Sequence, residues 1–170
     1  MWRTTELLVL EIGRDTERME VCKRIIFVGQ SGSSREPMAA GILKEFTLKH
    51  PVEVLARGLV VLFPEPMNQK AEAIMISNGI DTQGFVSQQL QEEDITEDTL
   101  ILTMESVHRD RILEQFENAN PEHVFVLTEF VGDELEILDP YGGALPNYGL
   151  CYESMRASIK KLVRILNENE

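Results

Sequence analysis

Cysteine is scarce in this chain, which holds only Cys22 and Cys151. The two stand far apart and in none of the spacings that build zinc sites, disulfide frameworks or redox pairs. We therefore predict two reduced thiols, as in a cytoplasmic protein, and neither a metal nor a cofactor.

Basic residues are also few. Lys and Arg number 16 against 29 Asp and Glu, which gives a formal net charge of −13. An acidic surface repels nucleic-acid phosphates and anionic lipids, so we expect neither nucleic acid nor a membrane as partner. No stretch approaches the roughly 18 apolar residues that span a bilayer, and residues 1–18 lack the apolar core and cleavage site of a signal peptide.

What the sequence does contain is organised around residues 23–40, KRIIFVGQSGSSREPMAA. Residues 25–28 form a short apolar run typical of a strand buried on both faces. Pro37 suits the first turn of a helix, where its missing N–H would be unpaired anyway. The glycines and serines between them allow a tight turn with inward N–H groups. Strand, loop and helix N-terminus together predict an anion site, with Arg35 as its guanidinium fork.

This segment resembles the phosphate loop of the low molecular weight protein tyrosine phosphatases, whose pattern is Val-Cys-x-Gly-Asn-x-Cys-Arg-Ser-Pro-Met-Ala. Residues 28–39 read Val-Gly-Gln-Ser-Gly-Ser-Ser-Arg-Glu-Pro-Met-Ala. The family's nucleophilic cysteine falls on Gly29 and its second cysteine on Ser34. The Asn and Ser that brace the family's loop fall on Gly32 and Glu36. The resemblance covers about residues 23–166.

The resemblance also implies the roles of particular residues. We call residues 29–35 the phosphate loop, and its expected anion contacts are Gly29, Gln30, Ser31, Gly32, Ser33, Ser34 and Arg35. Arg35 matches the arginine that holds the phosphate in the transition state, and Gly29 leaves the nucleophile position without a side chain. Asp139, in a Leu-Asp-Pro-Tyr-Gly-Gly motif, matches the general acid, and Tyr141 the aromatic rim. An Asp-Pro pair alone would indicate only a turn.

Apolar runs and amphipathic segments alternate along the rest of the chain. We predict strands at residues 25–28, 52–56, 99–104 and 124–127, and helices at 37–48, 67–78, 106–116 and 148–166. The alternation predicts one doubly wound α/β domain over residues 23–167, a four-stranded parallel sheet with helices on both faces. Ligands of such sheets bind beyond the carboxyl ends of the strands. Residues 1–22 are predicted to be a loosely ordered extension, with Met19 as an alternative start.

Two further features bear on the site. Glu36 would repel a phosphate dianion, so we expect it to pair with a cation, either Arg57 or Lys44. The apolar run at residues 59–63 follows the second strand. We expect it to pack inward, since apolar runs usually belong to the core, rather than to form a wall for a ligand or partner.

The missing nucleophile leaves three hypotheses open. In the first, which we favour, a catalytically impaired relative binds phosphate or phosphotyrosine-type anions in the phosphate loop, with a protein as a further partner to test. In the second, an active phosphatase uses Ser34 or a water as nucleophile and Asp139 as general acid. A serine hydroxyl needs a base, and no histidine lies near it in sequence. In the third, the protein is a structural or interaction protein whose pocket binds nothing, because Glu36 and a neighbour fill it with an internal ion pair.

Overall fold

The computed structural model describes residues 22–168, so the predicted N-terminal extension, apart from Cys22, lies outside the described residues. The strands are β1 (Arg24–Gly29), β2 (Glu53–Gly58), β3 (Thr99–Thr103) and β4 (Val124–Val126). The α-helices are α2 (Arg35–Lys44), α3 (Gln69–Ser77), α4 (Ser106–Gln115), α5 (Leu127–Val131) and α6 (Leu145–Glu168). Two short 3-10 turns, η1 (Glu92–Asp94) and η2 (Pro121–His123), complete the order.

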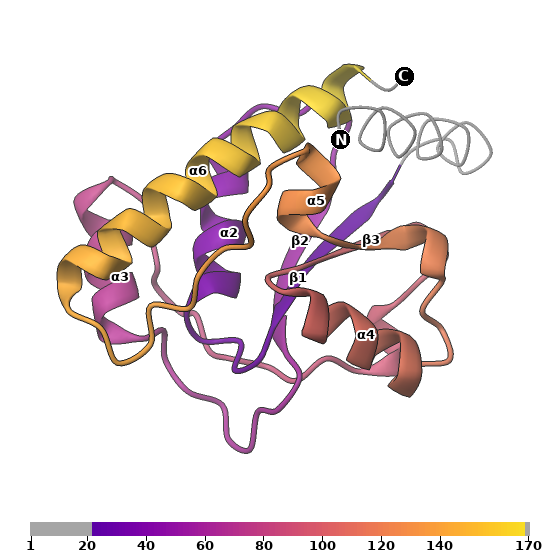
Figure 1. The fold of residues 1–170 in the computed structure, drawn as a ribbon, viewed down its shortest axis with the longest axis horizontal. Helices are drawn as coiled ribbons and strands as arrows, with labels where there is room; N and C mark the ends of the chain where they lie inside the picture. Colours follow the sequence, from indigo (N-terminus) through magenta and orange to yellow (C-terminus); the bar gives the residue numbers. More distant parts are fainter. Residues whose placement is uncertain (1–21, 169–170) are drawn as a thin grey trace.

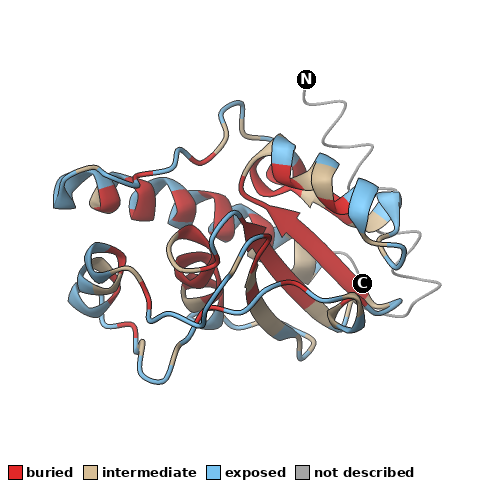
Figure 2. Cartoon of the chain, turned by 90° about the horizontal axis from the view of Figure 1, so that it is seen from below, coloured by how far each residue is buried: buried red, intermediate tan, exposed pale blue. Residues whose placement is uncertain are grey.

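The four strands form one parallel sheet in the order β2-β1-β3-β4. This confirms the predicted doubly wound α/β fold. The central strands β1 and β3 are buried on both faces, as their unbroken apolar runs require. Figure 2 shows the contrast between these strands and the exposed loops around them.

Helices cover both faces of the sheet (Figure 1). On one face, α2, α3, α5 and α6 pack around Phe27, Leu102 and Met155 in the larger apolar cluster. On the other, Ile112 of α4 packs on Ile26 and Ile101. Within the part of the chain that the structure describes, no helix is long and apolar enough to cross a bilayer.

Several element boundaries differ from the predicted ones. Helix α2 begins at Arg35, two residues before Pro37, and ends at Lys44 rather than at residue 48. The strand predicted at residues 124–127 ends at Val126, and the unpredicted helix α5 begins at Leu127. The apolar residues of α5 continue those of β4 in the sequence, so their pattern alone does not mark the change from strand to helix.

The apolar run at residues 59–63 packs inward only at its first residue, so the expectation of a buried run was wrong beyond that point. Leu59 is buried, whereas Leu62 and Phe63 are 82% and 71% exposed. The N–H groups of Leu59 and Val60 donate to the carbonyls of Gly29 and Gln30, which ties the run to the phosphate loop. The residues beyond this anchor form an exposed apolar edge beside the loop.

Candidate functional site

The phosphate loop joins the carboxyl end of β1 to the first residue of α2, at the edge of the sheet where ligands of this fold bind. Gly32 has φ of +72°, a conformation that favours glycine. A Cβ built on Gly58, at the end of β2, would lie 2.5 Å from the carbonyl carbon of Ser31. A glycine at the end of β2 therefore lets the neighbouring backbone close against the loop.

The interior of the loop holds the side chain of Glu36. Its Oε2 accepts a hydrogen bond from the N–H of Gly32 at 3.0 Å, and its Oε1 accepts one from the N–H of Ser34 at 3.4 Å. A Cβ built on Gly29 would collide with Oε2 and lie 2.7 Å from Cδ of Glu36. The carboxylate therefore fills the space beside the nucleophile position and occupies donors that point into the loop.

The expected cation partners of Glu36 were wrong. The guanidinium of Arg57 pairs instead with Asp94, at 3.1 Å. Lys44 stands in the last turn of α2, eight residues or about 12 Å along the helix axis. Glu36 is 2% exposed, and this burial raises its pKa even though the loop N–H groups and the charge of Arg35 act in the opposite direction.

Arg35 is buried, and its guanidinium binds groups outside the phosphate loop. Nη1 donates to the carbonyl of Ile137 and Nη2 to Oε2 of Glu105, both at 2.7 Å. Oδ2 of Asp139 lies 3.7 Å from Nη2. Arg35 thus links the start of α2 to the segment before α4 and to the loop between α5 and α6.

The predicted acid and rim residues lie beside Arg35. Asp139 has a half-exposed side chain, and its Oδ1 accepts a hydrogen bond from the N–H of Tyr141 at 3.0 Å. Tyr141 is 82% exposed. The structure therefore brings Asp139 and the phosphate-loop arginine together, with the tyrosine ring free at the surface.

Other candidate nucleophiles are poorly placed for the chemistry. The buried Oγ of Ser34 has no hydrogen-bond partner among the described residues, so no base contacts it there. His108 is buried, and its Nδ1 accepts from the N–H of Glu105. Cys151 on α6 lies close enough to Glu36, Arg35 and Asp139 to interact with their charges, but burial raises the pKa of its thiol to about 11. Its thiol therefore stays protonated near neutral pH.

This geometry can be compared with that of known proteins. The sequence model that describes the family of low molecular weight phosphotyrosine protein phosphatases matches residues 24–170 of this chain. The chain belongs to this family. The matched range includes the strand, loop and helix around residues 29–35 and the Asp-Pro-Tyr motif.

Three known proteins match this chain over nearly the whole of their own length. The low molecular weight protein-tyrosine-phosphatase PtpB of Staphylococcus aureus is 33% identical over 143 residues, which are 84% of this chain and 99% of PtpB. The solved YwlE arginine phosphatase of Geobacillus stearothermophilus is 32% identical, with TM-score 0.76 over 84% of this chain and 91% of that chain. The low molecular weight protein tyrosine phosphatase of T. tengcongensis is 30% identical, with TM-score 0.77 over 84% and 98%.

Sequence reasoning offered a loop filled by Glu36 as one of three hypotheses, but it missed that the N–H groups of Gly32 and Ser34 hold the carboxylate. It also missed Glu105 and Ile137, which hold the guanidinium of Arg35. The signal for Glu36 was present, because a residue without a side chain at position 29 leaves room for a larger one at position 36. No comparable signal marks a backbone carbonyl such as that of Ile137.

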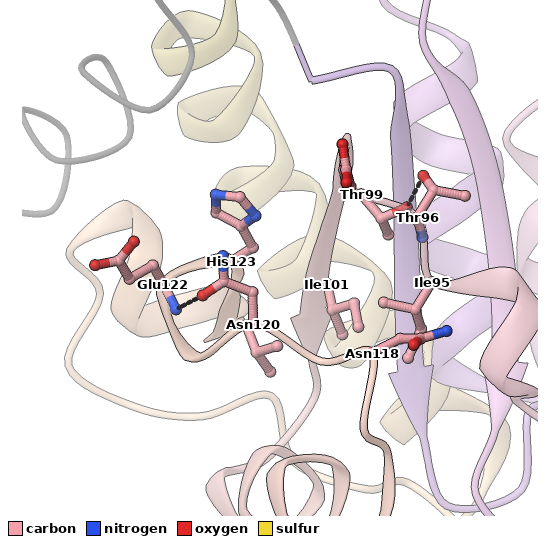
Figure 3. A pocket seen from close by; sticks show the side chains of 10 residues that line it. Ile95, Thr96, Thr99, Ile101, Asn118, Asn120, Glu122 and His123 are labelled. Carbon is pink, nitrogen blue, oxygen red and sulfur yellow. Dashed lines mark hydrogen bonds between the residues drawn. The ribbon is translucent and has the colours of Figure 1, made fainter. Parts of the chain in front are cut away.

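A cavity lies at the opposite edge of the sheet from the phosphate loop, at the amino ends of β3 and β4 (Figure 3). It measures about 620 Å³, with Ile95, Ile101 and Val124 among its apolar walls. Asn118, Asn120 and His123 line its polar side. None of the residues predicted for the phosphate site lines it, so it is separate from that site.

Proposed function

We propose that this protein is a catalytically impaired member of the phosphatase family, a binding module whose phosphate loop is occupied at rest by its own carboxylate. One observation carries the proposal: Glu36 accepts hydrogen bonds from the loop N–H groups of Gly32 and Ser34. A substrate phosphate would need the same donors. The filled loop at rest is the part of the third hypothesis that the proposal adopts, and anion binding is kept from the first hypothesis.

The chemistry of the nucleophile position supports the same proposal. Hydrolysis through a covalent phosphoenzyme needs a side-chain nucleophile, and Gly29 supplies none. Loss of a nucleophile commonly lowers the rate by about 10⁴ to 10⁶. A water attacking in its place would have to enter space that Glu36 occupies.

The ligand class follows from the family rather than from a bound molecule. The named relatives include a protein-tyrosine-phosphatase and an arginine phosphatase, so a phosphate carried by a side chain is the ligand class to test, with the free anion beside it. The unpaired Cys22 and Cys151 suit a reducing compartment, and we propose the cytoplasm as the site of action.

The test is an assay of para-nitrophenyl phosphate hydrolysis on four proteins: wild type, Gly29→Cys, Glu36→Ser, and the variant carrying both changes. We expect no turnover by wild type or Glu36→Ser. The double variant has both the nucleophile and the space it needs, so we expect it to exceed wild type by at least about 10³-fold. Gly29→Cys alone should stay well below the double variant, because the new side chain and Glu36 compete for the same space.

Arg35→Ala in the wild-type background is the matched control. If wild type hydrolyses the substrate faster than Arg35→Ala, the second hypothesis replaces the present proposal, and Ser34 or an activated water becomes the nucleophile to identify. A folded double variant with no activity would show that the loop has lost more than its cysteine.

A further inference from the structure

The backbone N–H donors expected of a phosphate site are present in this chain, and they already donate to the carboxylate of Glu36. Gly32 and Ser34 direct their N–H groups at one carboxylate, and both oxygens of that carboxylate are used. The loop leads directly into the ten-residue helix α2, whose N-terminal end favours negative charge. Glu36 therefore stands where an external oxyanion would stand, as an anion supplied by the chain itself.

The bound carboxylate is held at an electrostatic cost. Burial removes Glu36 from water, and the nearest cation, Arg35, directs its guanidinium toward Glu105 and Ile137. Desolvation outweighs the favourable contacts and raises the pKa of Glu36. The titratable groups around this site are Arg35 on α2, Cys151 on α6, Glu105 and His108 at the start of α4, and Asp139 in the loop before α6.

Removing the carboxylate would leave polar groups unsatisfied. The N–H groups of Gly32 and Ser34 would lose their acceptor, and the buried hydroxyl of Ser34 already has no hydrogen-bond partner among residues 22–168. Buried donors without acceptors are costly, so the emptied loop would favour a new acceptor. A tetrahedral oxyanion offers several acceptor oxygens and the negative charge that the helix end favours.

From this geometry we propose that Glu36 is a built-in competitor for the phosphate loop. An oxyanion, either free or carried on a side chain, binds when the carboxylate is protonated or leaves the loop. The inference rests on the proposed function, because it requires a loop that is filled at rest. It adds the regulation of that loop: anion affinity rises as the pH falls and Glu36 becomes neutral.

The first test is calorimetric titration of the full chain with sulfate, whose charge does not change over the range used, at about pH 7.5 and about pH 5. We expect wild type to bind sulfate at least about tenfold more tightly at the lower pH. Glu36→Ser should bind about equally well at both. Glu65→Ser, which changes an exposed carboxylate on the neighbouring loop, should behave as wild type.

The second test measures the protons taken up when sulfate binds to wild type, from titrations at neutral pH in buffers of different ionisation enthalpy. Linkage requires proton uptake if binding and protonation of Glu36 are coupled. The uptake should be absent in Glu36→Gln, which keeps the shape of the side chain and cannot ionise. Because this measurement and the wild-type pH dependence need no serine variant, the proposal is testable even if Glu36→Ser does not fold.

A third comparison separates the two sources of the anion. Phenyl phosphate that binds Glu36→Ser at least about tenfold more tightly than inorganic phosphate would assign the loop to a side-chain phosphate. Equal affinities would assign it to the free anion.

Two results would overturn the inference: sulfate affinity of wild type that is the same at both pH values, or folded Glu36→Ser that binds no sulfate. Hydrolysis of phenyl phosphate by wild type is a separate result. It would overturn the proposed function without deciding whether Glu36 competes.

Discussion

Two loops meet at Arg35, and they differ in what this chain has kept of the family pattern. The loop before α6 carries Asp139, Pro140 and Tyr141 of the predicted acid motif, and the Asp139 side chain is half exposed beside the arginine. The phosphate loop runs between β1 and α2, has Gly29 at the position predicted for the nucleophile, and holds the carboxylate of Glu36 inside. Under the proposed function, one loop retains reactive groups and the other retains only its shape.

The difference shows that the shape of an anion loop and its chemistry can be separated. In this chain the loop N–H groups obtain an acceptor from Glu36, so the loop needs neither a cysteine nor a bound phosphate to satisfy them. The loop between α5 and α6 is held by other contacts. The N–H of Tyr141 donates to Asp139, Arg35 contacts Ile137 and Asp139, and the N–H of Ser106 donates to Glu136.

The largest expected effect concerns the loop before α6 and whether Asp139 can act as a general acid. In the variant carrying Gly29→Cys and Glu36→Ser, adding Asp139→Asn should lower the hydrolysis rate by about 10³-fold, because general acid catalysis contributes on that order. The rate is measured with para-nitrophenyl phosphate against pH. The control is Asp110→Asn, since Asp110 is exposed on α4. An unchanged rate after Asp139→Asn would mean that Asp139 is a structural turn residue.

Arg35 joins the two loops, so its removal should be costly in stability. Arg35→Ala leaves the carbonyl of Ile137 and the carboxylate of Glu105 without their donor, and we expect unfolding to become easier by about 3 kcal/mol. Chemical denaturation measures the change. Arg111→Ala is the matched control, because Arg111 is an arginine whose Nη1 donates an exposed hydrogen bond to Oε1 of Gln30 at 3.3 Å. A similar loss of stability there would remove the special role of Arg35.

The space at position 29 gives a smaller stability effect. Gly29→Cys should cost about 2 kcal/mol, since its Cβ collides with Glu36 and forces that side chain from its N–H donors. In the Glu36→Ser background the same change should cost much less. A double-mutant cycle by denaturation measures the coupling, and strictly additive effects would contradict the shared space.

The pH dependence of Glu36 gives the smallest effect. Its pKa is higher in the folded chain than the ordinary value of 4.5, so the folded state holds its proton more tightly than the unfolded state. Between pH 4.5 and the raised pKa, wild type should lose stability relative to Glu36→Gln as pH rises, by at most about 1.4 kcal/mol per pH unit. Paired denaturation curves across this range measure the difference, and a stability difference that does not change with pH would disprove the burial effect.

The fold could be predicted from the sequence because the central strands have a clear apolar pattern. The residues of β1 and β3 are almost continuously apolar, and the glycine- and serine-rich segment after β1 marks a turn at the sheet's carboxyl edge. The side-chain direction of Glu36 was not readable in the same way. It depends on α2 beginning at Arg35, two residues earlier than the proline signal suggested. Likewise, the exposed edge at Leu62 and Phe63 follows from backbone bonds at Leu59 and Val60 that no apolar pattern encodes.

Because the carboxylate of Glu36 is covalently part of the chain, it affects the concentration at which a dissolved anion can occupy the loop. A carboxylate on the chain itself acts at an effective concentration of about millimolar or higher, which does not fall when the protein is diluted. The loop therefore behaves as though a ligand were always in excess. The amide protons of Gly32 and Ser34 should exchange slowly with solvent in a buffer that contains no anion, whereas a loop that depends on dissolved phosphate would protect them only after the ligand is added.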